Sequence, residues 1–400
     1  MEKKKVCVFF GGKSFEHDVS ILTGIDVCFS IDSTKYDVYP VYIDIENNWW
    51  FGGDLLDKRS YPLNDRVKQN LLKMQFTVKN NRGFLESQKG GIFGRKKIDF
   101  DIAFLAFHGD YGETGYFQGL CETANIPYTG CDTKSSAVFM DKSLTKKIAK
   151  NLGIPVLDEE VIKKPINNEF FDIEELTSKI KLPLPLIVKP NSLGSSVGVK
   201  KATNNDELYA AILSVFALGD DALLEPFVEN LEEYNVSVTR AFGETRTSVI
   251  ERPKKKNDEL LSFNEKYRAG GSKSKMGGSK FGGGKFGNGG ASAMINMTRD
   301  FNPEELSKED TENIKKWATD IFEAVGGNGD PRIDFLCNGK TRELYFCEVN
   351  PLPGSFAYYL WEASEPSVNY TELLTALLEE AENKFTKKRQ SIVLTESKIF

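Results

Sequence analysis

The sequence contains little histidine, with only His17 and His108 among its 400 residues. A zinc site built on histidine is therefore not expected. Six cysteines occur without any Cys-x-x-Cys pair. This pattern predicts reduced, mostly buried thiols rather than disulfides or a metal cluster. Any metal ion should instead be bound by oxygen ligands such as carboxylates and amides.

Long apolar runs and an excess of positive charge are also missing. No apolar run approaches the roughly 20 residues that a membrane-spanning helix needs. The apolar residues 6–10, which follow a basic start, are too short for a signal-peptide core. A formal net charge of −6 argues against a broad nucleic-acid-binding surface. We therefore predict a cytoplasmic protein with neither membrane nor nucleic acid as a partner.

The composition is that of an ordinary globular protein, with 40% apolar and 28% charged residues. Strand-like runs at residues 4–10 and 102–107 alternate with helical patterns, the first of which begins near Val19. This alternation favours an α/β layer with a mostly parallel sheet. Four hundred residues allow two or three domains.

Further along the chain, one helix is expected to contain Met140, Asp141 and Lys142 and to end at Gly153. Residues 184–189 and 196–200 read as two strands joined by a glycine-containing hairpin. Residues 270–290 differ in composition from the rest of the chain, because ten of these 21 residues are glycine. Such a segment buries little apolar area, so the composition predicts a mobile lid.

The strongest local pattern is an acidic hairpin. Residues 332–336 and 344–350 both read as strands, and Asn338-Gly339 is a turn signal between them. Because side chains alternate along a strand, Arg332 shares a face with Asp334, and Glu348 shares a face with Asn350. If the strands pair antiparallel, Asp334 lies near Glu348, and the site gathers hard oxygen ligands suited to Mg²⁺. The alternative is a surface hairpin with ordinary charges.

Residues 189–198 (KPNSLGSSVG) form a candidate phosphate loop. Gly194 and Gly198 allow the backbone to approach an anion closely, and successive N–H groups can bind phosphate oxygens. Lys189 ends the preceding strand and can place a positive charge on a phosphate. The loop lacks the Gly-Lys-Ser/Thr ending of a Walker A motif. A plain hairpin turn remains the alternative.

Two other loops follow buried strands, at residues 11–18 and 107–113. Ligands of open α/β sheets bind outside the carboxyl ends of the strands, where these loops lie. Helix capping is the other interpretation of each loop.

In order along the chain, these motifs resemble those of the D-alanine–D-alanine ligase family of the ATP-grasp superfamily. The resemblance covers roughly residues 4–380. The matching segments are FFGG with Glu16, Val19 and Ser20; HG with Gly112, Glu113 and Gly115; QGL at 118–120; IPYTG at 126–130; MDK at 140–142; VKP at 188–190 with GSSVG at 194–198; EKY at 265–267; RID at 332–334; and EVN at 348–350 with Pro353-Gly354.

The resemblance implies an ATP-grasp fold, α/β with α+β character in the ATP-binding part. It implies a Rossmann-like N-terminal domain at residues 1–130 and a small central domain at 131–228. The C-terminal catalytic domain is expected at 229–385, with the glycine-rich lid at 268–292 and a tail at 386–400.

The resemblance also assigns roles to matching residues. The implied ATP-binding residues are Lys142, Lys189, Ser195, Ser196, Glu225, Phe227, Val228, Glu233 and Lys266. The implied metal ligands, for two Mg²⁺ ions with Mn²⁺ as a possible substitute, are Asp334, Glu348 and Asn350. The implied catalytic residues are Glu16, which binds the ammonium of the first amino acid together with Ser195 and Tyr267, and Arg332 and Gly354, which stabilise the oxyanion. The implied substrate-binding residues are His108, Ser355 and Tyr359.

The chemistry expected from this resemblance is ATP-dependent ligation of two D-alanines for peptidoglycan precursors. A carboxylate is a poor electrophile, and phosphorylation by ATP converts it to an acyl phosphate that an amine can attack. Amino acids and ATP are the expected small-molecule partners, and family members often form homodimers.

Departures from the family pattern concern the acceptor. Family members usually present a serine for the second substrate's carboxylate where this chain has Tyr359. The run Asn350-Pro351-Leu352-Pro353 also differs from the more usual Asn-Thr-x-Pro. A ligase with another amino acid, a hydroxy acid or another amine as acceptor is therefore an alternative. Tyr267 favours amide over ester formation. A nucleotide-binding regulator without catalytic activity is a third reading, which the presence of Asp334 and Glu348 opposes.

Overall fold

The computed structural model describes residues 2–91, 94–166, 172–254 and 299–391. The glycine-rich segment expected to be a lid, together with Lys266 and Tyr267, lies outside the described residues. All six cysteines lie within them, and none forms a disulfide. Among the described residues, no helix is both long and apolar enough to cross a bilayer.

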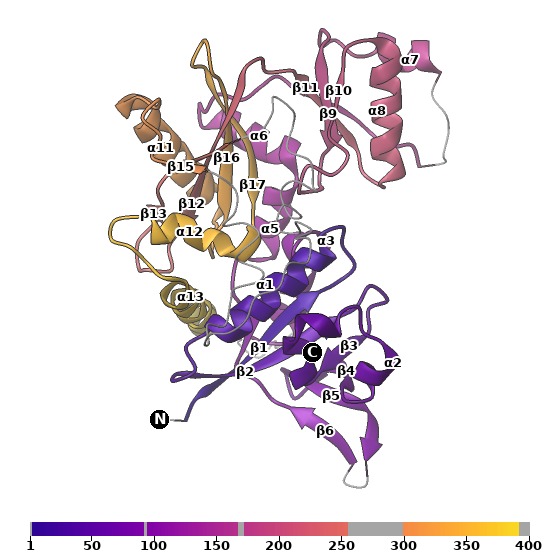
Figure 1. Ribbon diagram of the computed structural model, residues 1–400, viewed down its shortest axis with the longest axis vertical. Coiled ribbons are helices and arrows are strands. Elements are labelled where there is room, and N and C mark those ends of the chain that lie inside the picture. Colours follow the sequence, from indigo (N-terminus) through magenta and orange to yellow (C-terminus); the bar gives the residue numbers. More distant parts are fainter. Residues whose placement is uncertain (1, 92–93, 167–171, 255–298, 392–400) are drawn as a thin grey trace, which may run out of the picture.

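Three sheets organise the part of the chain that the structure describes (Figure 1). The N-terminal sheet has the order β6-β5-β4-β3-β2-β1-β7. Strand β1 runs parallel to β2 and β7, and the other neighbours are antiparallel. Its strands are β1 (Lys4–Gly11), β2 (Tyr36–Ile43), β3 (Trp49–Phe51), β4 (Leu72–Lys79), β5 (Arg82–Gly91), β6 (Gly94–Ile98) and β7 (Ile102–Leu105). The expected parallel part is thus confined to the first strands.

The central sheet is small and antiparallel, with the order β10-β9-β11-β8. Its strands are β8 (Glu160–Ile162), β9 (Leu186–Pro190), β10 (Lys200–Ala202) and β11 (Ala222–Pro226). Helices α7 (Ile173–Ser178) and α8 (Asn205–Ala217) pack on it. This unit lies at the upper right of Figure 1.

The C-terminal sheet has the order β15-β14-β12-β16-β17, with β13 paired to β12. Its strands are β12 (Leu231–Thr239), β13 (Arg246–Thr247), β14 (Glu251–Pro253), β15 (Arg299–Phe301), β16 (Arg332–Asn338) and β17 (Leu344–Asn350). Helix α11 (Lys308–Val325) covers it through Ile314, Ala318 and Ile321, as the apolar spacing predicts.

The remaining helices cover the N-terminal sheet or connect the units. They are α1 (His17–Ser30), α2 (Asp65–Lys68), α3 (Asp110–Glu113), α4 (Tyr116–Thr123), α5 (Thr133–Met140), α6 (Lys142–Asn151), α12 (Tyr358–Glu362) and α13 (Tyr370–Ser391), with short 3-10 turns η1 (Gly53–Leu56), η2 (Lys58–Ser60) and η3 (Gly354–Ala357).

The sequence predicts one continuous helix through Asp141, but the structure has two helices there, α5 and α6. Asp141 is extended, with φ −84° and ψ 100°, and its side chain accepts a hydrogen bond from the Leu144 backbone N–H as the N-cap of α6. Both helices pack against the C-terminal sheet through Phe139 and Ala149, although they precede the central sheet in the chain. The break turns Lys142 into the first residue of a new helix.

Two other boundaries differ from expectation. The strand expected at residues 196–200 begins only at Lys200, because Ser195, Ser196 and Gly198 have positive φ and form a turn. The tail expected at 386–400 begins inside α13, which continues to Ser391. This helix returns to the N-terminal sheet, where Leu374 and Leu377 join the core beside β1 and β7.

Candidate active site

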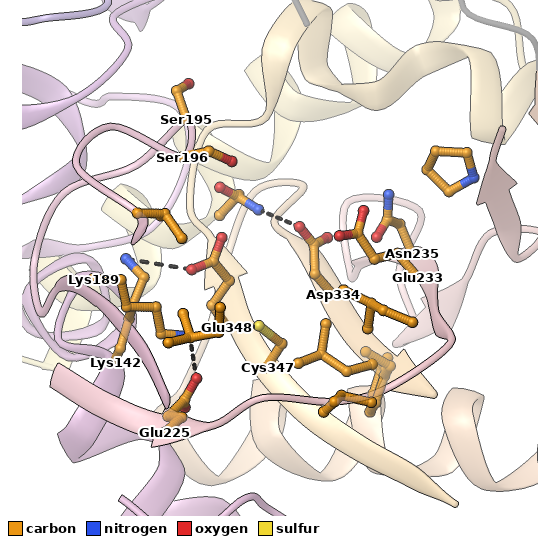
Figure 2. A pocket seen from close by; sticks show the side chains of 18 of the residues that line it. Lys142, Lys189, Ser195, Ser196, Glu225, Glu233, Asn235, Asp334, Cys347 and Glu348 are labelled. Carbon is orange, nitrogen blue, oxygen red and sulfur yellow. Dashed lines mark hydrogen bonds and ion pairs between the residues drawn. The ribbon is translucent and has the colours of Figure 1, made fainter. Parts of the chain in front are cut away.

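One cavity lies between the central and C-terminal sheets. Its lining includes Lys189 and Glu225 from the central sheet and Asp334 and Glu348 from the acidic hairpin. Figure 2 shows these side chains around a common space, with the lysines and Glu348 on one side and Glu233, Asn235 and Asp334 on the other. The other predicted ATP-binding residues among those described, Lys142, Ser195, Ser196, Phe227, Val228 and Glu233, also line it.

The glycine–serine loop connects β9 to β10, which pair antiparallel, so the expected hairpin is confirmed. Gly194 permits a close approach to the N-terminal unit, because a Cβ there would lie 3.1 Å from Glu16 Oε2. Across this approach, Ser195 Oγ donates a hydrogen bond to Glu16 Oε1. The loop therefore closes the end of the cavity by contacting the N-cap residue of α1.

Lysines at the base of the loop are held by acidic partners. Lys142 Nζ lies 3.3 Å from Glu348 Oε2 and donates a 2.6 Å hydrogen bond to the Leu193 carbonyl. Lys189 Nζ lies 2.7 Å from Glu225 Oε2. Burial opposes the charge on Lys189, but Cys347, Glu225 and Glu348 outweigh it and raise its pKa. Lys189 therefore presents a positive charge to the cavity, which Lys142 also lines.

Glu225 lies between two lysines. It is buried and contacts Lys146 as well as Lys189. Burial alone would raise the pKa of this carboxyl, but the two lysines lower it to about 2. Its carboxylate is thus engaged by side chains of the protein, and Lys146 is a participant that the sequence motifs did not reveal.

The acidic hairpin has the predicted register. Asp334 pairs with Glu348 across β16 and β17, and Arg332 pairs with Asn350. Arg332 binds Asp334 side-on, with Nε and Nη2 at 2.7 and 2.8 Å from its two oxygens. Burial opposes the charged guanidinium, yet Asp334 raises the pKa of Arg332. Asn350 Nδ2 donates a 3.0 Å hydrogen bond to Asp334 Oδ2.

These residues fit a magnesium site. Two carboxylates and one amide oxygen on facing strands are hard ligands of the kind that Mg²⁺ prefers when it also binds phosphates. Glu348 lies on the side of Lys142, 3.3 Å from its Nζ, whereas Asp334 lies on the other side of the cavity (Figure 2). In the described part of the chain, no group of three or more His, Cys, Asp or Glu side chains could hold a metal ion, and this site combines two carboxylates with an amide instead.

Glu113 is a second buried carboxyl, and it lies near Glu16. The family resemblance assigns no role to Glu113. It accepts a 3.1 Å hydrogen bond from the Gly109 backbone N–H. Burial first, and then the charge of Glu16, raises its pKa well above the ordinary value. Burial and the neighbouring Glu16 thus both disfavour a negative charge on Glu113.

The predicted substrate-binding residues are placed differently from one another. Tyr359 lines the cavity, whereas His108 and Ser355 are buried and are not among its lining residues. His108 bridges Thr23 Oγ1 at 2.8 Å and the Leu352 carbonyl at 2.9 Å. It thus ties the N-terminal unit to the loop that leads into Gly354, which begins the buried turn η3.

Comparisons with known proteins agree with this arrangement. A family model described as the D-ala D-ala ligase N-terminus matches residues 5–131, and the corresponding C-terminus model matches residues 148–278 and 292–379. The chain belongs to the D-alanine–D-alanine ligase family. It is therefore an ATP-dependent ligase with the ATP-grasp fold.

Individual relatives match over nearly the whole chain. A D-alanine–D-alanine ligase of Thermosipho melanesiensis is 34% identical over 383 residues, which are 96% of this chain and 94% of the relative. The solved D-alanine-D-alanine ligase of Coxiella burnetii has a TM-score of 0.75 at 24% identity and covers 98% of this chain and 97% of its own. That of Bacillus anthracis, complexed with ATP, has a TM-score of 0.60 at 24% identity and covers 96% and 99%. Both structures support the family's fold for this chain.

Proposed function

We propose that this protein joins two D-alanines with ATP and supplies the dipeptide for peptidoglycan precursors. One observation carries the proposal: Ser195, which lines the cavity with Lys142 and Lys189, contacts Glu16, the carboxylate proposed to bind the first amino acid. Family membership and the names of the relatives support the same substrates.

In the first step, a carboxylate oxygen of one D-alanine attacks the γ-phosphorus of ATP, and ADP leaves. Glu16 holds the ammonium of this D-alanine, with Ser195 and Tyr267 fixing its orientation. Lys142 and Lys189 bind the phosphates, and Glu233 and the region around Glu225 to Val228 hold the ribose and adenine. Bound Mg²⁺ supplies charge neutralisation on the phosphates, and Asp334, Glu348 and Asn350 would hold it.

In the second step, the amine of the other D-alanine attacks the acyl carbon. The oxyanion collapses, the bond between the acyl carbon and the phosphate oxygen breaks, and phosphate leaves with the proton that the amine gives up. Arg332 and the Gly354 amide stabilise the oxyanion, and losing one such donor typically costs about 3–4 kcal/mol. Arg332 is preorganised for this role because Asp334 fixes its guanidinium. Acyl phosphates hydrolyse, so the glycine-rich lid at 268–292 would exclude water during this step.

The three sheets support the proposed division into N-terminal, central and C-terminal domains. A cytoplasmic location and a homodimer are part of the same proposal, and light scattering of the purified protein tests the dimer.

An acceptor other than D-alanine is a second candidate, favoured by Tyr359 in place of the usual serine. ADP release measured with D-amino acids, L-amino acids and hydroxy acids, alone and in pairs, separates these possibilities. Release with D-alanine alone, with D-alanyl-D-alanine as product, supports the first proposal. Release only with a mixed pair favours the second, and release with no combination contradicts both.

A further inference from the structure

Four polar side chains that line the cavity form a cluster. They come from four different elements and all line the cavity: Asn235 on β12, Glu251 on β14, Arg299 on β15 and Tyr359 on α12. We call this set the Glu251 cluster. Only Tyr359 was expected here from the sequence.

Glu251 is buried, and its contacts are made within the cluster. Its Oε1 accepts hydrogen bonds from Asn235 Nδ2 and from the Tyr359 hydroxyl, each at 3.0 Å. Its Oε2 lies 3.1 Å from Arg299 Nη1. The Tyr359 hydroxyl is therefore directed at a protein carboxylate, which leaves it poorly placed to bind a substrate carboxylate.

Arg299 is held on two sides. Its guanidinium carbon lies 3.8 Å from the centre of the Tyr359 ring, and the Glu251 ion pair fixes one edge. Stacking on an aromatic ring and pairing with a carboxylate both restrict a guanidinium, whose planar set of N–H donors matches carboxylate geometry. A guanidinium fixed in this way is preorganised to bind a second carboxylate at low entropic cost.

Two guanidiniums, those of Arg299 and Arg332, act on Tyr359 in this part of the cavity. Burial and then the Glu251 carboxylate raise the pKa of Tyr359 to about 12, although the two guanidiniums lower it. Arg332 is bound side-on to Asp334, next to the proposed reacting carbon. Arg299 and Arg332 line the same cavity, so an acceptor whose carboxylate binds Arg299 lies in the same cavity as the proposed oxyanion donor.

We propose that Arg299 binds the carboxylate of the acceptor amino acid, and that Glu251 and Tyr359 are positioning residues that hold Arg299. The proposal rests on the ligase function above and specifies its acceptor as a small amino acid with a free carboxylate. Arg299 thereby takes the place of the serine hydroxyl that other family members present.

The test compares D-alanine with D-alaninamide as acceptors. D-alaninamide has no carboxylate to phosphorylate, so it can serve only as the acceptor, and mass spectrometry distinguishes the two products. The wild-type enzyme should prefer D-alanine. Arg299→Met should raise the KM for the acceptor about 10- to 100-fold, as expected for a lost charged hydrogen bond, and should abolish the preference over the amide. The KM values for ATP and for the first D-alanine should stay within about twofold.

Arg252→Met is the matched control. Arg252 lies on β14 and pairs with Asp300, the neighbour of Arg299, but does not line the cavity. Arg299→Lys keeps the positive charge, so it should keep part of the preference for D-alanine over D-alaninamide. This variant is used for the test if Arg299→Met does not fold.

Tyr359→Phe keeps the aromatic ring and should raise the KM for the acceptor less than Arg299→Met does.

The outcomes separate the two proposals. An active wild-type enzyme whose acceptor preference is unchanged in Arg299→Met and Arg299→Lys overturns this inference alone. A wild-type enzyme that releases no ADP with any amino acid overturns the ligase function, and this inference with it.

Discussion

Ser195 Oγ donates a hydrogen bond to the Glu16 carboxylate, so the loop of the central sheet contacts the first helix of the N-terminal unit. The two residues are 179 positions apart in the sequence. Their contact is what connects the proposed phosphate loop to the proposed amino-acid site.

Removing this contact should slow the reaction. We expect Ser195→Ala to lower kcat about 10- to 100-fold, because a hydrogen bond to a charged group contributes about 1.5–3 kcal/mol. Coupled ADP-release kinetics measure the effect. Ser214→Ala is the control, since Ser214 lies on α8 and donates only to the Ala211 carbonyl. Equal rates in both variants would contradict a role for Ser195 in the reaction.

The proposed metal ligands make a separate prediction. Asp334→Asn and Glu348→Gln should each abolish ADP release with a circular dichroism spectrum like that of the wild type, because each removes a charged oxygen ligand but keeps the side-chain shape. Chelation of Mg²⁺ should stop the wild-type reaction, and Mn²⁺ should restore part of it. Asp320→Asn, on the outer face of α11 beside Lys316, should leave the rate unchanged. Wild-type rates in Asp334→Asn and Glu348→Gln would refute the metal assignment.

Lys146 should contribute to the free energy of unfolding. Its side chain is 1% exposed and contacts Glu225, so Lys146→Met leaves Glu225 with one of its two cationic partners. Breaking a buried ion pair by removing one partner typically costs about 3–5 kcal/mol, and urea unfolding should show a loss of this size. Lys147→Met is the matched neighbour, because Lys147 is exposed and bonds only Ser143. A loss of under about 1 kcal/mol in Lys146→Met would show that Lys189 alone balances Glu225.

His108 should make the fold acid-sensitive. Burial lowers its pKa to about 4, whereas an unfolded histidine titrates near about 6.5. Between these values the unfolded chain binds more protons than the folded one, so the contribution of neutral His108 to stability is present above about pH 6.5 and declines as the pH falls. The expected loss between pH 7.5 and pH 5 is about 2 kcal/mol.

Urea unfolding at the two pH values measures this loss. His108→Gln cannot gain the proton, so its stability should fall about 2 kcal/mol less than that of the wild type over the same interval. Parallel losses in the two proteins would assign the acid sensitivity to other groups.

Much of the site followed from local patterns. The hairpin of Asp334 and Glu348 was predictable because strand alternation and a turn signal fix which residues face each other. The family resemblance placed Glu16 next to Ser195, a proximity that no local pattern contains.

Other parts depended on packing that a sequence does not display. Asp141 sits within a continuous helical pattern, and only the capping of α6 shows the break. Glu251 and Arg299 belong to short strands of three residues each, and their meeting with Tyr359 follows from tertiary contacts. A substitution such as Tyr359 signals that an acceptor site differs, but the residue that compensates has to be found in space.

Helix α13 covers one face of the N-terminal sheet, where its leucines join Val6, Val8 and Phe104 in one core. The sheet precedes the helix in the sequence, so the ribosome makes the sheet before the helix. We therefore expect the first 130 residues to remain incompletely folded during synthesis until the helix has emerged, because a sheet face without its cover leaves large apolar side chains in water. The two ends of the chain would then complete their folding together, after the central unit has formed.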